Sequence, residues 1–378
     1  MKVNLLCAGA ARGLAERLAI EAGTGIEGSF GEVGSLVEKF LAREPCELLV
    51  LTHAQVAMLM ARKRLVADFC ADLGTVRAAV AVRAGDAKPD VSTSAALRAA
   101  LLEADAIHIP DPARTTAGIH LAGVLDALGI AGEVSSRLRG HPNGMSALRA
   151  LGEAPGRPIG CALATEIVEA PTVALVARLP REHEFATVYT AALNAATPSR
   201  GARALASRIT SRDTAADRLA AGFEGMAIVR AGAADTANAR ALVFGVLAEY
   251  GLTPEPDATD ADLMDLDRGF LADGGMFDVA VAPDGSLAAC CGMKVLGGGR
   301  LELRKMYVRR DQRGQGLGQR LLDRALAWAR GRGFPRVELE TASVLKEAIA
   351  LYRKAGFEPR PGKPDTRRCD LAFVLALD

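Results

Sequence analysis

Residues 313–318 read Arg313-Gly314-Gln315-Gly316-Leu317-Gly318, and this glycine-rich run stands between a β-like stretch and a helical one. The β-like stretch is Leu301–Val308, and the helix is expected over Leu317–Arg330, where apolar side chains recur at helical spacing. Glycines let backbone N–H groups approach a ligand closely, and the start of a helix attracts an anion. The sequence therefore predicts a site for a pyrophosphate where this helix begins.

The segments on either side of the glycine run decide which kind of phosphate site it is. Two strands are expected before it, Phe277–Ala282 and Leu287–Val295, joined by the turn Pro283-Asp284-Gly285. A third strand, Val337–Glu340, and a helix, Lys346–Lys354, are expected after it. An antiparallel meander argues against a dinucleotide-binding fold, and the run lacks the Lys-Ser/Thr pair of a P-loop.

Two motifs in this order resemble those of the GNAT superfamily of N-acetyltransferases. Arg313–Gly318 matches the R/Q-x-x-G-x-G/A pyrophosphate loop, and the segment from Ala348 to Phe357 matches A-x-x-L-Y-x-x-x-G-F. The resemblance covers about 227–378 and implies an acyl-CoA N-acyltransferase fold with a mixed, mostly antiparallel sheet. One departure is Leu345, where the family often has an asparagine that contacts CoA.

The resemblance also implies where acetyl-CoA, as the co-substrate, is held. The pantetheine arm is expected along one edge of the strand before the loop, where a backbone amide can also polarise the thioester oxygen. The pyrophosphate is expected on the loop and the first turn of the helix. The implied binding residues are Met306, Tyr307, Val308, Arg313, Gly314, Gln315, Gly316, Leu317, Gly318 and Gln319.

Acyl transfer to an amine also needs an acid and a base. The resemblance points to Tyr352 as the acid that protonates the CoA thiolate; the alternative is an aromatic side chain that only packs. Glu302 is the first candidate for the base and Glu340 the second, each acting on the amine through a water. For both, the alternative is a solvated strand carboxylate.

The sequence does not identify the acceptor amine. Asp260, Asp262 and Asp265 lie in an acidic stretch that can attract a cationic amine or can form a solvated loop. The run Arg367–Asp370 is expected to lie near the acceptor, and only its place in the sequence suggests this.

Residues 1 to about 225 follow a different pattern, in which short apolar strands alternate with helical segments. Val3–Cys7, Gly25–Phe30 and Leu48–Leu51 are expected strands, with helices after each. Such alternation predicts βαβ units and a mostly parallel sheet, whose ligands lie at the carboxyl ends of the strands.

This part, over about 1–223, resembles type II periplasmic binding proteins, most closely the molybdate-binding branch. The residues that carry the resemblance are spread along the chain: Ala8-Gly9-Ala10, Ser29-Phe30-Gly31, Leu48–His53, Asp111-Pro112, Ala117-Gly118, Leu128-Gly129, Leu179-Pro180 and Ala220–Phe223. It implies two α/β lobes with a ligand clamped between them. We expect the crossovers at Arg77–Val82 and Thr172–Val176, which divides the chain into lobe one (1–77 and 175–223) and lobe two.

The sequence departs from the molybdate-binding pattern at positions that are expected to contact the ligand. Ala10 replaces the serine of the opening Ala-Gly-Ser, and Glu32 precedes Val33-Gly34, where the family has Ser-Gly. A carboxylate there repels an oxyanion, so a different small ligand is expected. The candidate cleft residues are Ala10, Ser35, Thr52, Thr115, Thr116 and Thr165, with His53 and Glu166 also polar. The alternative is a degenerate fold that binds nothing.

The charge and composition of the whole chain limit its expected partners and location. Its 378 residues carry a net charge of +1, so no global field recruits nucleic acid or an anionic membrane, and no apolar run is long enough to span a bilayer. Its start lacks a signal-peptide pattern, and its seven scattered cysteines suit free thiols, which predicts a cytoplasmic location. The five histidines form no metal-binding pattern, and nothing fixes the oligomeric state.

These observations predict two α/β domains, a binding-protein-like one at 1–223 and a GNAT one at 227–378, in contact across a short linker. The expected function is acetyl-CoA-dependent N-acetylation of an unknown amine, which can be a small molecule or a protein. The first domain is expected to bind a small molecule and can also act as its sensor. The alternative is a small-molecule sensor whose GNAT domain binds acetyl-CoA without catalysis.

Overall fold

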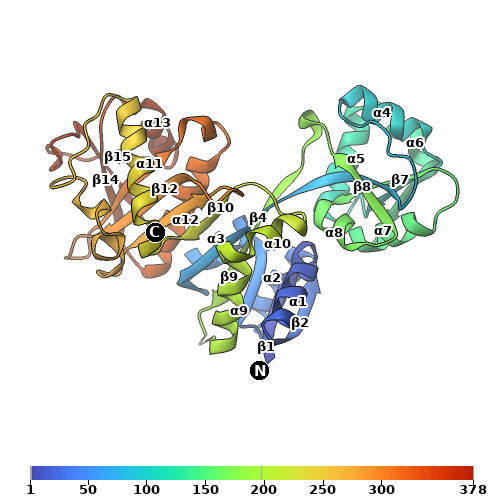
Figure 1. Ribbon diagram of the computed structural model, residues 1–378, viewed down its shortest axis with the longest axis horizontal. Coiled ribbons are helices and arrows are strands. Elements are labelled where there is room, and N and C mark those ends of the chain that lie inside the picture. The colour runs from blue at the N-terminus through green and yellow to red at the C-terminus, as the bar shows by residue number, and fades with distance from the viewer. Residues whose placement is uncertain (1, 197, 378) are drawn as a thin grey trace.

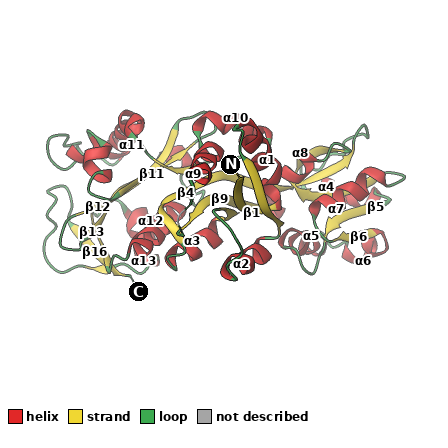
Figure 2. Ribbon diagram, turned by 90° about the horizontal axis from the view of Figure 1, so that it is seen from below, coloured by secondary structure: helices red, strands yellow, loops and turns green. Residues whose placement is uncertain are grey.

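The computed structural model describes residues 2–196 and 198–377, which form three bodies (Figure 1). Lobe one lies between the other two, with lobe two on the right and the C-terminal domain on the left of that view. Figure 2 shows the same three bodies in a row, with the N-terminus in the middle. The N-terminal part, which consists of the two lobes, and the C-terminal domain are both mixed α/β structures, as the sequence predicts.

Lobe one is a sheet with helices packed on it, built from βαβ units. β1, β2 and β3 are parallel, whereas β9 runs antiparallel beside β3. The 3-10 turn η1 (Gly9–Ala11) joins β1 to α1. The strands are β1 (Lys2–Ala8), β2 (Gly25–Gly31), β3 (Leu48–Thr52) and β9 (Ala186–Asn194), and the helices are α1 (Arg12–Glu21), α2 (Val33–Leu41), α3 (His53–Ala61), α9 (Arg200–Thr210) and α10 (Ala215–Ala220).

Lobe two repeats this architecture on a smaller scale. Three of its helices begin at polar caps: Thr93, Thr115 and Asn143 each accept a hydrogen bond from a backbone N–H of the first turn. The strands are β5 (Ala106–Pro110), β6 (Leu138–His141), β7 (Pro158–Leu163) and β8 (Val173–Arg178), and the helices are α4 (Ser94–Glu103), α5 (Thr116–Ala127), α6 (Ala131–Val134), α7 (Gly144–Glu153) and α8 (Ala164–Glu169).

The long strand β4 (Leu65–Arg83) belongs to both lobes. Up to Arg77 it pairs with β9, and from Ala78 it pairs with β7. The first predicted crossover therefore lies at the point where β4 passes from one lobe to the other. The second prediction, Thr172–Val176, is wrong, because β8 pairs with β4 inside lobe two. The chain returns only over residues 179–185, so lobe one resumes at β9.

The C-terminal domain is built on one seven-stranded sheet in the order β10-β11-β12-β13-β14-β16-β15. Its neighbouring strands are antiparallel except for β13 and β14. The strands are β10 (Ala227–Arg230), β11 (Met276–Val281), β12 (Leu287–Val295), β13 (Leu301–Val308), β14 (Arg336–Thr341), β15 (Glu358–Pro359) and β16 (Leu371–Ala376), and the helices are α11 (Thr236–Glu249), α12 (Leu317–Arg332) and α13 (Lys346–Lys354).

Lobe one and the C-terminal domain share one hydrophobic core. Leu59 and Met60 of α3 belong to the same buried cluster as Leu321 and Trp328 of α12. Gly331 approaches Met60 so closely that an added Cβ would press on its carbonyl oxygen. Because burying one large apolar side chain contributes roughly 1.5–3 kcal/mol, this contact holds the two bodies together. Lobe one and the C-terminal domain are therefore packed against each other rather than joined by the chain alone.

Some chain-wide features bear on the sequence predictions. All seven cysteines are free, and six of them are buried. Among residues 2–196 and 198–377, no single helix meets the length and apolarity needed to cross a membrane, whereas α5 with residues 131–137 meets them only as a pair bent by 119°. Within the same residues, no cluster of three or more metal-ligating side chains occurs.

Candidate active site

The glycine run forms the turn into α12. Gly314 and Gly316 have left-handed backbones, with φ of 76° and 75°, which glycine adopts without strain. Gly316 is the N-cap of α12, and Leu317 is buried as the anchor of the first turn. The loop backbone thus exposes N–H groups at the positive end of a sixteen-residue helix, an arrangement that binds anions.

Strand β13 presents a free backbone edge next to this loop. It pairs with β14 only at Glu302 and Leu303, after which the two strands separate. A bulge also interrupts its pairing with β12, and Lys305 at this point has φ of 53°. The edge of Met306–Val308 is therefore open to a ligand strand, where the pantetheine arm is predicted.

A cavity of about 480 Å³ joins the loop to this edge. It is lined by all but one of the predicted catalytic and acetyl-CoA-binding residues; the exception is Gln315, whose side chain is exposed. Leu345, at the departure from the GNAT pattern, also lines it. Its lining residues are Glu302, Leu303, Arg304, Lys305, Met306, Tyr307, Val308, Arg313, Gly314, Gly316, Leu317, Gly318, Gln319, Tyr352 and others from 246–259, 340–351 and 366–369.

Arg313 is tied to the protein on several sides. Its Nε donates to the carbonyl oxygen of Val308 at 3.0 Å, and one Nη pairs with Glu249 at 2.6 Å. Its guanidinium also lies 5.4 Å from the ring centre of Tyr250. These contacts fix the loop against β13 and α11, so Arg313 shapes the loop as well as adding positive charge.

Tyr352 extends from α13 into the cavity. It is 6% exposed, and its ring packs 5.8 Å from that of Phe357. Burial raises the pKa of its phenol well above the usual value, so the hydroxyl keeps its proton at neutral pH. A phenol that keeps its proton at this place can share it with a thiolate as the C–S bond breaks.

Glu302 and Glu340, the two candidates for the base, differ in their contacts. Glu302 is 7% exposed and pairs with Arg304 through Oε2 alone, which leaves Oε1 for a water or an amine. Burial raises its pKa, although Arg304 partly offsets the rise. Glu340 accepts hydrogen bonds on both oxygens, from Arg360 and from the backbone of the loop at 365–366, and its pKa is lowered despite burial. The geometry favours Glu302.

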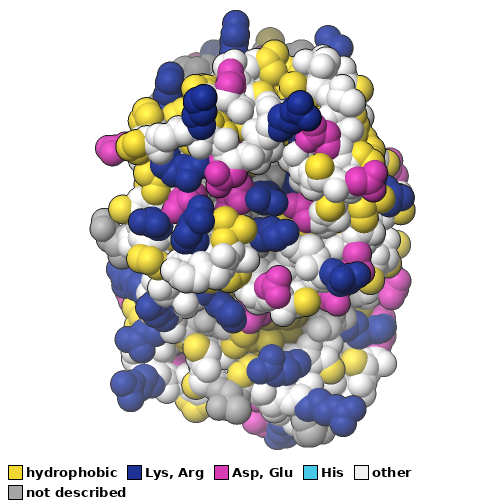
Figure 3. Space-filling view, turned by 90° about the vertical axis from the view of Figure 1, so that its left-hand side faces the viewer, with side chains coloured by type: hydrophobic (Ala, Val, Ile, Leu, Met, Phe, Trp, Pro, Cys, Tyr) yellow, Lys and Arg dark blue, Asp and Glu magenta, His cyan; other side chains and the backbone are white. Residues whose placement is uncertain are grey.

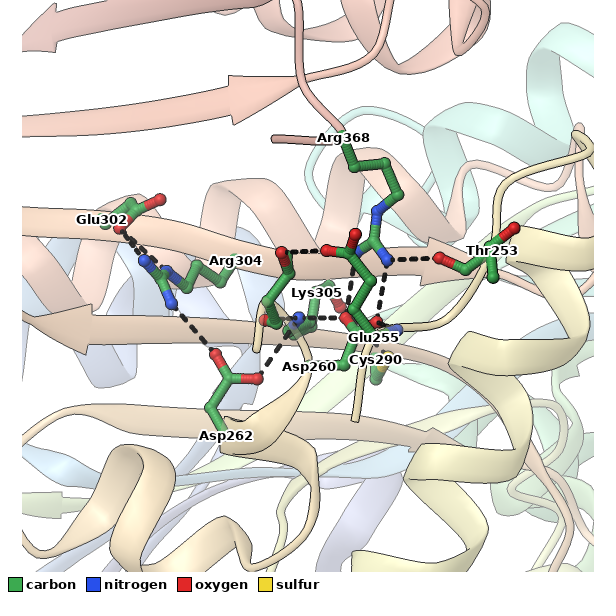
Figure 4. Close-up of polar contacts among 10 residues, drawn as sticks. Thr253, Glu255, Asp260, Asp262, Cys290, Glu302, Arg304, Lys305 and Arg368 are labelled. Carbon is green, nitrogen blue, oxygen red and sulfur yellow. Dashed lines mark hydrogen bonds and ion pairs between the residues drawn. The ribbon is translucent and has the colours of Figure 1, made fainter. Parts of the chain in front are cut away.

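Of the three acidic candidates, Asp265 is exposed, whereas Asp260 and Asp262 are neither solvated nor free to attract a cation. Asp260 and Asp262 are buried within a network of ion pairs that Figure 4 shows in full. Asp260 pairs with Lys305 at 2.5 Å and with both Nη atoms of Arg368 at 2.8 and 2.9 Å. Asp262 pairs with Arg304 at 3.2 Å. Their charges are already paired, and they hold Arg304, Lys305 and Arg368, which line the cavity.

This network joins three separate parts of the chain. Arg368 comes from the loop before β16, Asp260 from the loop after α11, and Lys305 from the bulge of β13. Of the run Arg367–Asp370, Arg368 and Cys369 line the cavity, whereas Arg367 and Asp370 are not among its lining residues. Figure 3 views this end of the molecule, where basic and acidic side chains intermix on the visible surface. Sequence patterns missed the network because its partners lie far apart along the chain.

The candidate ligand residues of the first domain are only partly brought together. Ala10 in η1 and Thr165 in α8 are buried, and α8 packs across the cleft against η1. The Thr165 hydroxyl has no hydrogen-bond partner among the described residues. Thr115 caps α5 through Gly118, while Ser35 and Thr116 are exposed and Thr52 is half-buried at the end of β3.

Glu169 of lobe two crosses to lobe one at the start of α1. Its carboxylate lies against Gly13, so close that any Cβ at Gly13 would collide with it. The first turn of a helix favours a negative group, so Glu169 occupies the position that an anion would take. Glu32, which the sequence suggested would repel an oxyanion, is exposed at the start of α2.

Comparison with known proteins agrees with both halves of this description. The model of the bacterial extracellular solute-binding protein family matches residues 6–224, and that of the acetyltransferase (GNAT) family matches residues 245–357. An uncharacterized N-acetyltransferase of Escherichia coli is 42% identical over 118 residues, 30% of this chain and 70% of the relative. An aconitate isomerase of a Pseudomonas species is 26% identical over 200 residues, 50% of this chain and 71% of the relative.

Among solved structures, the periplasmic molybdate-binding protein of Azotobacter vinelandii is 17% identical, with a TM-score of 0.46, over 58% of this chain and 98% of that one. The family matches and the Escherichia coli relative decide the classification. The chain belongs to the bacterial solute-binding protein family in its first part and to the GNAT family in its second, and is a GNAT-type N-acyltransferase fused to a solute-binding domain.

Proposed function

We propose that the C-terminal domain transfers an acetyl group from acetyl-CoA to an amine, with Glu302 as the base and Tyr352 as the acid. The observation that carries this proposal is the single cavity that the glycine loop, the free edge of β13, Glu302 and Tyr352 line together. The loop is suited to the pyrophosphate, the edge to the pantetheine arm, and the two side chains to the proton transfers.

The proposed reaction follows from these positions. Glu302 accepts a proton from the amine, directly or through a water, and the amine nitrogen attacks the thioester carbon. The oxyanion that forms is stabilised by a backbone N–H of Met306–Val308. When the C–S bond breaks, the thiolate takes a proton from the Tyr352 hydroxyl, which leaves the amide and free CoA as products.

Acetyl-CoA binding is the first measurement that tests this proposal. In calorimetry, the full chain is expected to bind acetyl-CoA saturably, and Gly316→Glu is expected to weaken binding by about 100-fold or more. The new carboxylate faces the pyrophosphate, and like charges at close contact cost several kcal/mol. The left-handed backbone adds roughly 1–2 kcal/mol of strain.

Gly285→Glu is the matched control for this substitution. Gly285 also has a left-handed backbone, with φ of 83°, and a Cβ there meets no atom within 4 Å, as at Gly316. It lies in the β11–β12 turn, outside the lining of the cavity. Equal loss of binding in both variants, or no binding by the wild type, would contradict the proposed nucleotide site.

The pH dependence of the rate tests the role of Glu302. A base must be ionised to act, so kcat/KM should rise with pH through the pKa of Glu302, which burial lifts above the ordinary value of about 4.3. Glu302→Gln should lower kcat by about 100-fold or more and remove this acid limb. Glu340→Gln serves as the comparison, because the pKa of Glu340 is lowered and the limb should persist. A limb that survives Glu302→Gln would exclude Glu302 as the base.

For the first domain we propose a small ligand other than a tetrahedral oxyanion. What supports this is the carboxylate of Glu169 at the start of α1, which would repel an oxyanion, and the replacement of a serine by Ala10. A cytoplasmic location stays a prediction, supported by the seven free thiols. Equilibrium dialysis of the full chain with molybdate or sulfate should show no saturable binding.

A further inference from the structure

Helix α12 lies along strand β4 of lobe one, with one contact at each helical turn. Arg320 pairs with Asp72 at 2.7 Å, and Arg324 donates to the carbonyl oxygen of Cys70. One turn further, Trp328 Nε1 donates to Asp68 at 3.2 Å. Arg332, another turn along, pairs with the same carboxylate at 3.1 Å. We call this row of contacts the α12–β4 ladder.

The ladder follows from the geometry of the two elements. Four residues of an α-helix rise about 6 Å, and two residues of a strand rise about 6.6 Å. Positions 320, 324 and 328 on the helix therefore meet positions 72, 70 and 68 on the strand, in the antiparallel sense. Such a match sets both the rotation and the axial position of α12 relative to lobe one.

Asp72 is the fully buried rung of the ladder. Besides Arg320, it accepts hydrogen bonds from the Thr190 hydroxyl at 2.7 Å and from the backbone N–H of Ile228 at 3.2 Å. Burial alone would raise its pKa, but His53 and Arg320 hold the pKa well below the usual value. Asp72 is therefore a fixed negative charge that belongs to the solute-binding domain.

Arg320 lies in the turn of α12 that carries the glycine loop. Its backbone N–H donates to the carbonyl oxygen of Gly316 at 3.1 Å, while its neighbour Gln319 lines the cavity. Its side chain does not line the cavity, and it contacts Asp72 and, at 3.3 Å, the carbonyl oxygen of Met226. The contact with Asp72 thus fixes the turn that presents the pyrophosphate-binding amides.

We propose that Asp72, a residue of the solute-binding domain, is a positioning residue of the acetyl-CoA site and acts through Arg320. The solute-binding domain then completes the acetyltransferase: its strand β4 holds the first turn of α12 in the orientation that binds the pyrophosphate. This inference rests on the proposed binding of acetyl-CoA at residues 313–318.

The test compares two rungs of the same ladder in the full chain. Asp72→Asn keeps the size of the side chain but removes the charge that holds Arg320. It is expected to raise the Kd for acetyl-CoA about tenfold, which lies within the range for residues that act on a site through others. At saturating acetyl-CoA, kcat should stay within about twofold, because Tyr352 and Glu302 are untouched.

Asp68→Asn is the control at the far end of α12, where the carboxylate belongs to the same ladder but is more exposed than that of Asp72. Asp68 contacts Trp328 and Arg332, which lie away from the glycine loop. Its Kd for acetyl-CoA should stay within about twofold of the wild type, as expected for a side chain remote from the site. Thermal unfolding of both variants separates a loss of stability from a loss of affinity.

Arg320→Gln gives a second route to the same answer if Asp72→Asn does not fold. It should weaken acetyl-CoA binding to a similar extent, and the double variant should be no weaker than either single one, because both remove one interaction. Wild-type affinity in both single variants, or an equal loss in Asp68→Asn, would overturn the inference. Absence of binding by the wild type would instead overturn the proposed function.

Discussion

Tyr352→Phe is expected to lower kcat by about 10²–10⁴-fold, the range for loss of a general acid, while the Kd for acetyl-CoA stays unchanged. The variant removes only the hydroxyl and retains the ring that packs on Phe357. Without a proton donor, the thiolate must leave as an anion in a buried pocket, which raises the barrier of that step. Steady-state release of free thiol, together with calorimetry of acetyl-CoA, measures both quantities.

Tyr307→Phe is the control for this experiment. Tyr307 lines the same cavity from β13, and burial raises its pKa as it does for Tyr352. Its predicted part in binding is made by its backbone, which the substitution leaves in place. If Tyr307→Phe rather than Tyr352→Phe caused the large loss of kcat, the acid would be Tyr307.

The largest expected effect on stability is that of Asp278→Ala. Asp278 is 1% exposed and pairs with Arg324 at 2.5 Å and with Arg230 at 2.7 Å. Burial alone would raise its pKa, but these two arginines hold the pKa below the usual value. Removing the carboxylate leaves Arg324 buried without a counter-charge, which costs about 3–5 kcal/mol of unfolding free energy. Denaturant unfolding of the full chain measures this loss.

Two further variants show whether the loss of stability comes from the buried, unpaired charge of Arg324. Asp323→Ala, an exposed carboxylate on the same helix, should change the unfolding free energy by no more than about 0.5 kcal/mol. Asp278→Leu combined with Arg324→Met should recover much of the stability, because a well-packed apolar pair often replaces a buried ion pair without loss. An Asp278→Ala variant as stable as the wild type would show that Arg324 gains another partner.

The sequence predicted the regular elements around the glycine loop closely. The bounds predicted for Leu301–Val308 and Lys346–Lys354 are those of β13 and α13. Helix α12 runs on to Arg332, where Gly333 ends it with φ of 80°. These elements have strong local signals: alternation, apolar spacing and glycine stops. The division of the chain at 224–226 and the assignment of site residues remain predictions.

Features that depend on contacts between residues far apart in the sequence could not be predicted from local patterns. Asp260 meets Arg368 across 108 positions, and no local pattern distinguishes such a pair from two solvated charges. The second crossover was misplaced because β8 has the apolar pattern of any buried strand, and its pairing with β4 is set by tertiary contacts. The spacing of Arg320, Arg324 and Trp328 was visible, but the strand that matches it was not.

The way in which lobe two joins the chain has a consequence for how such a fusion can change over time. The chain leaves lobe one at Arg77 and re-enters it at Ala186, and these two residues are paired neighbours on β4 and β9. Lobe two is thus topologically a long insertion at the tip of a hairpin. Its length and sequence can therefore change without altering the residues of β4 that contact α12.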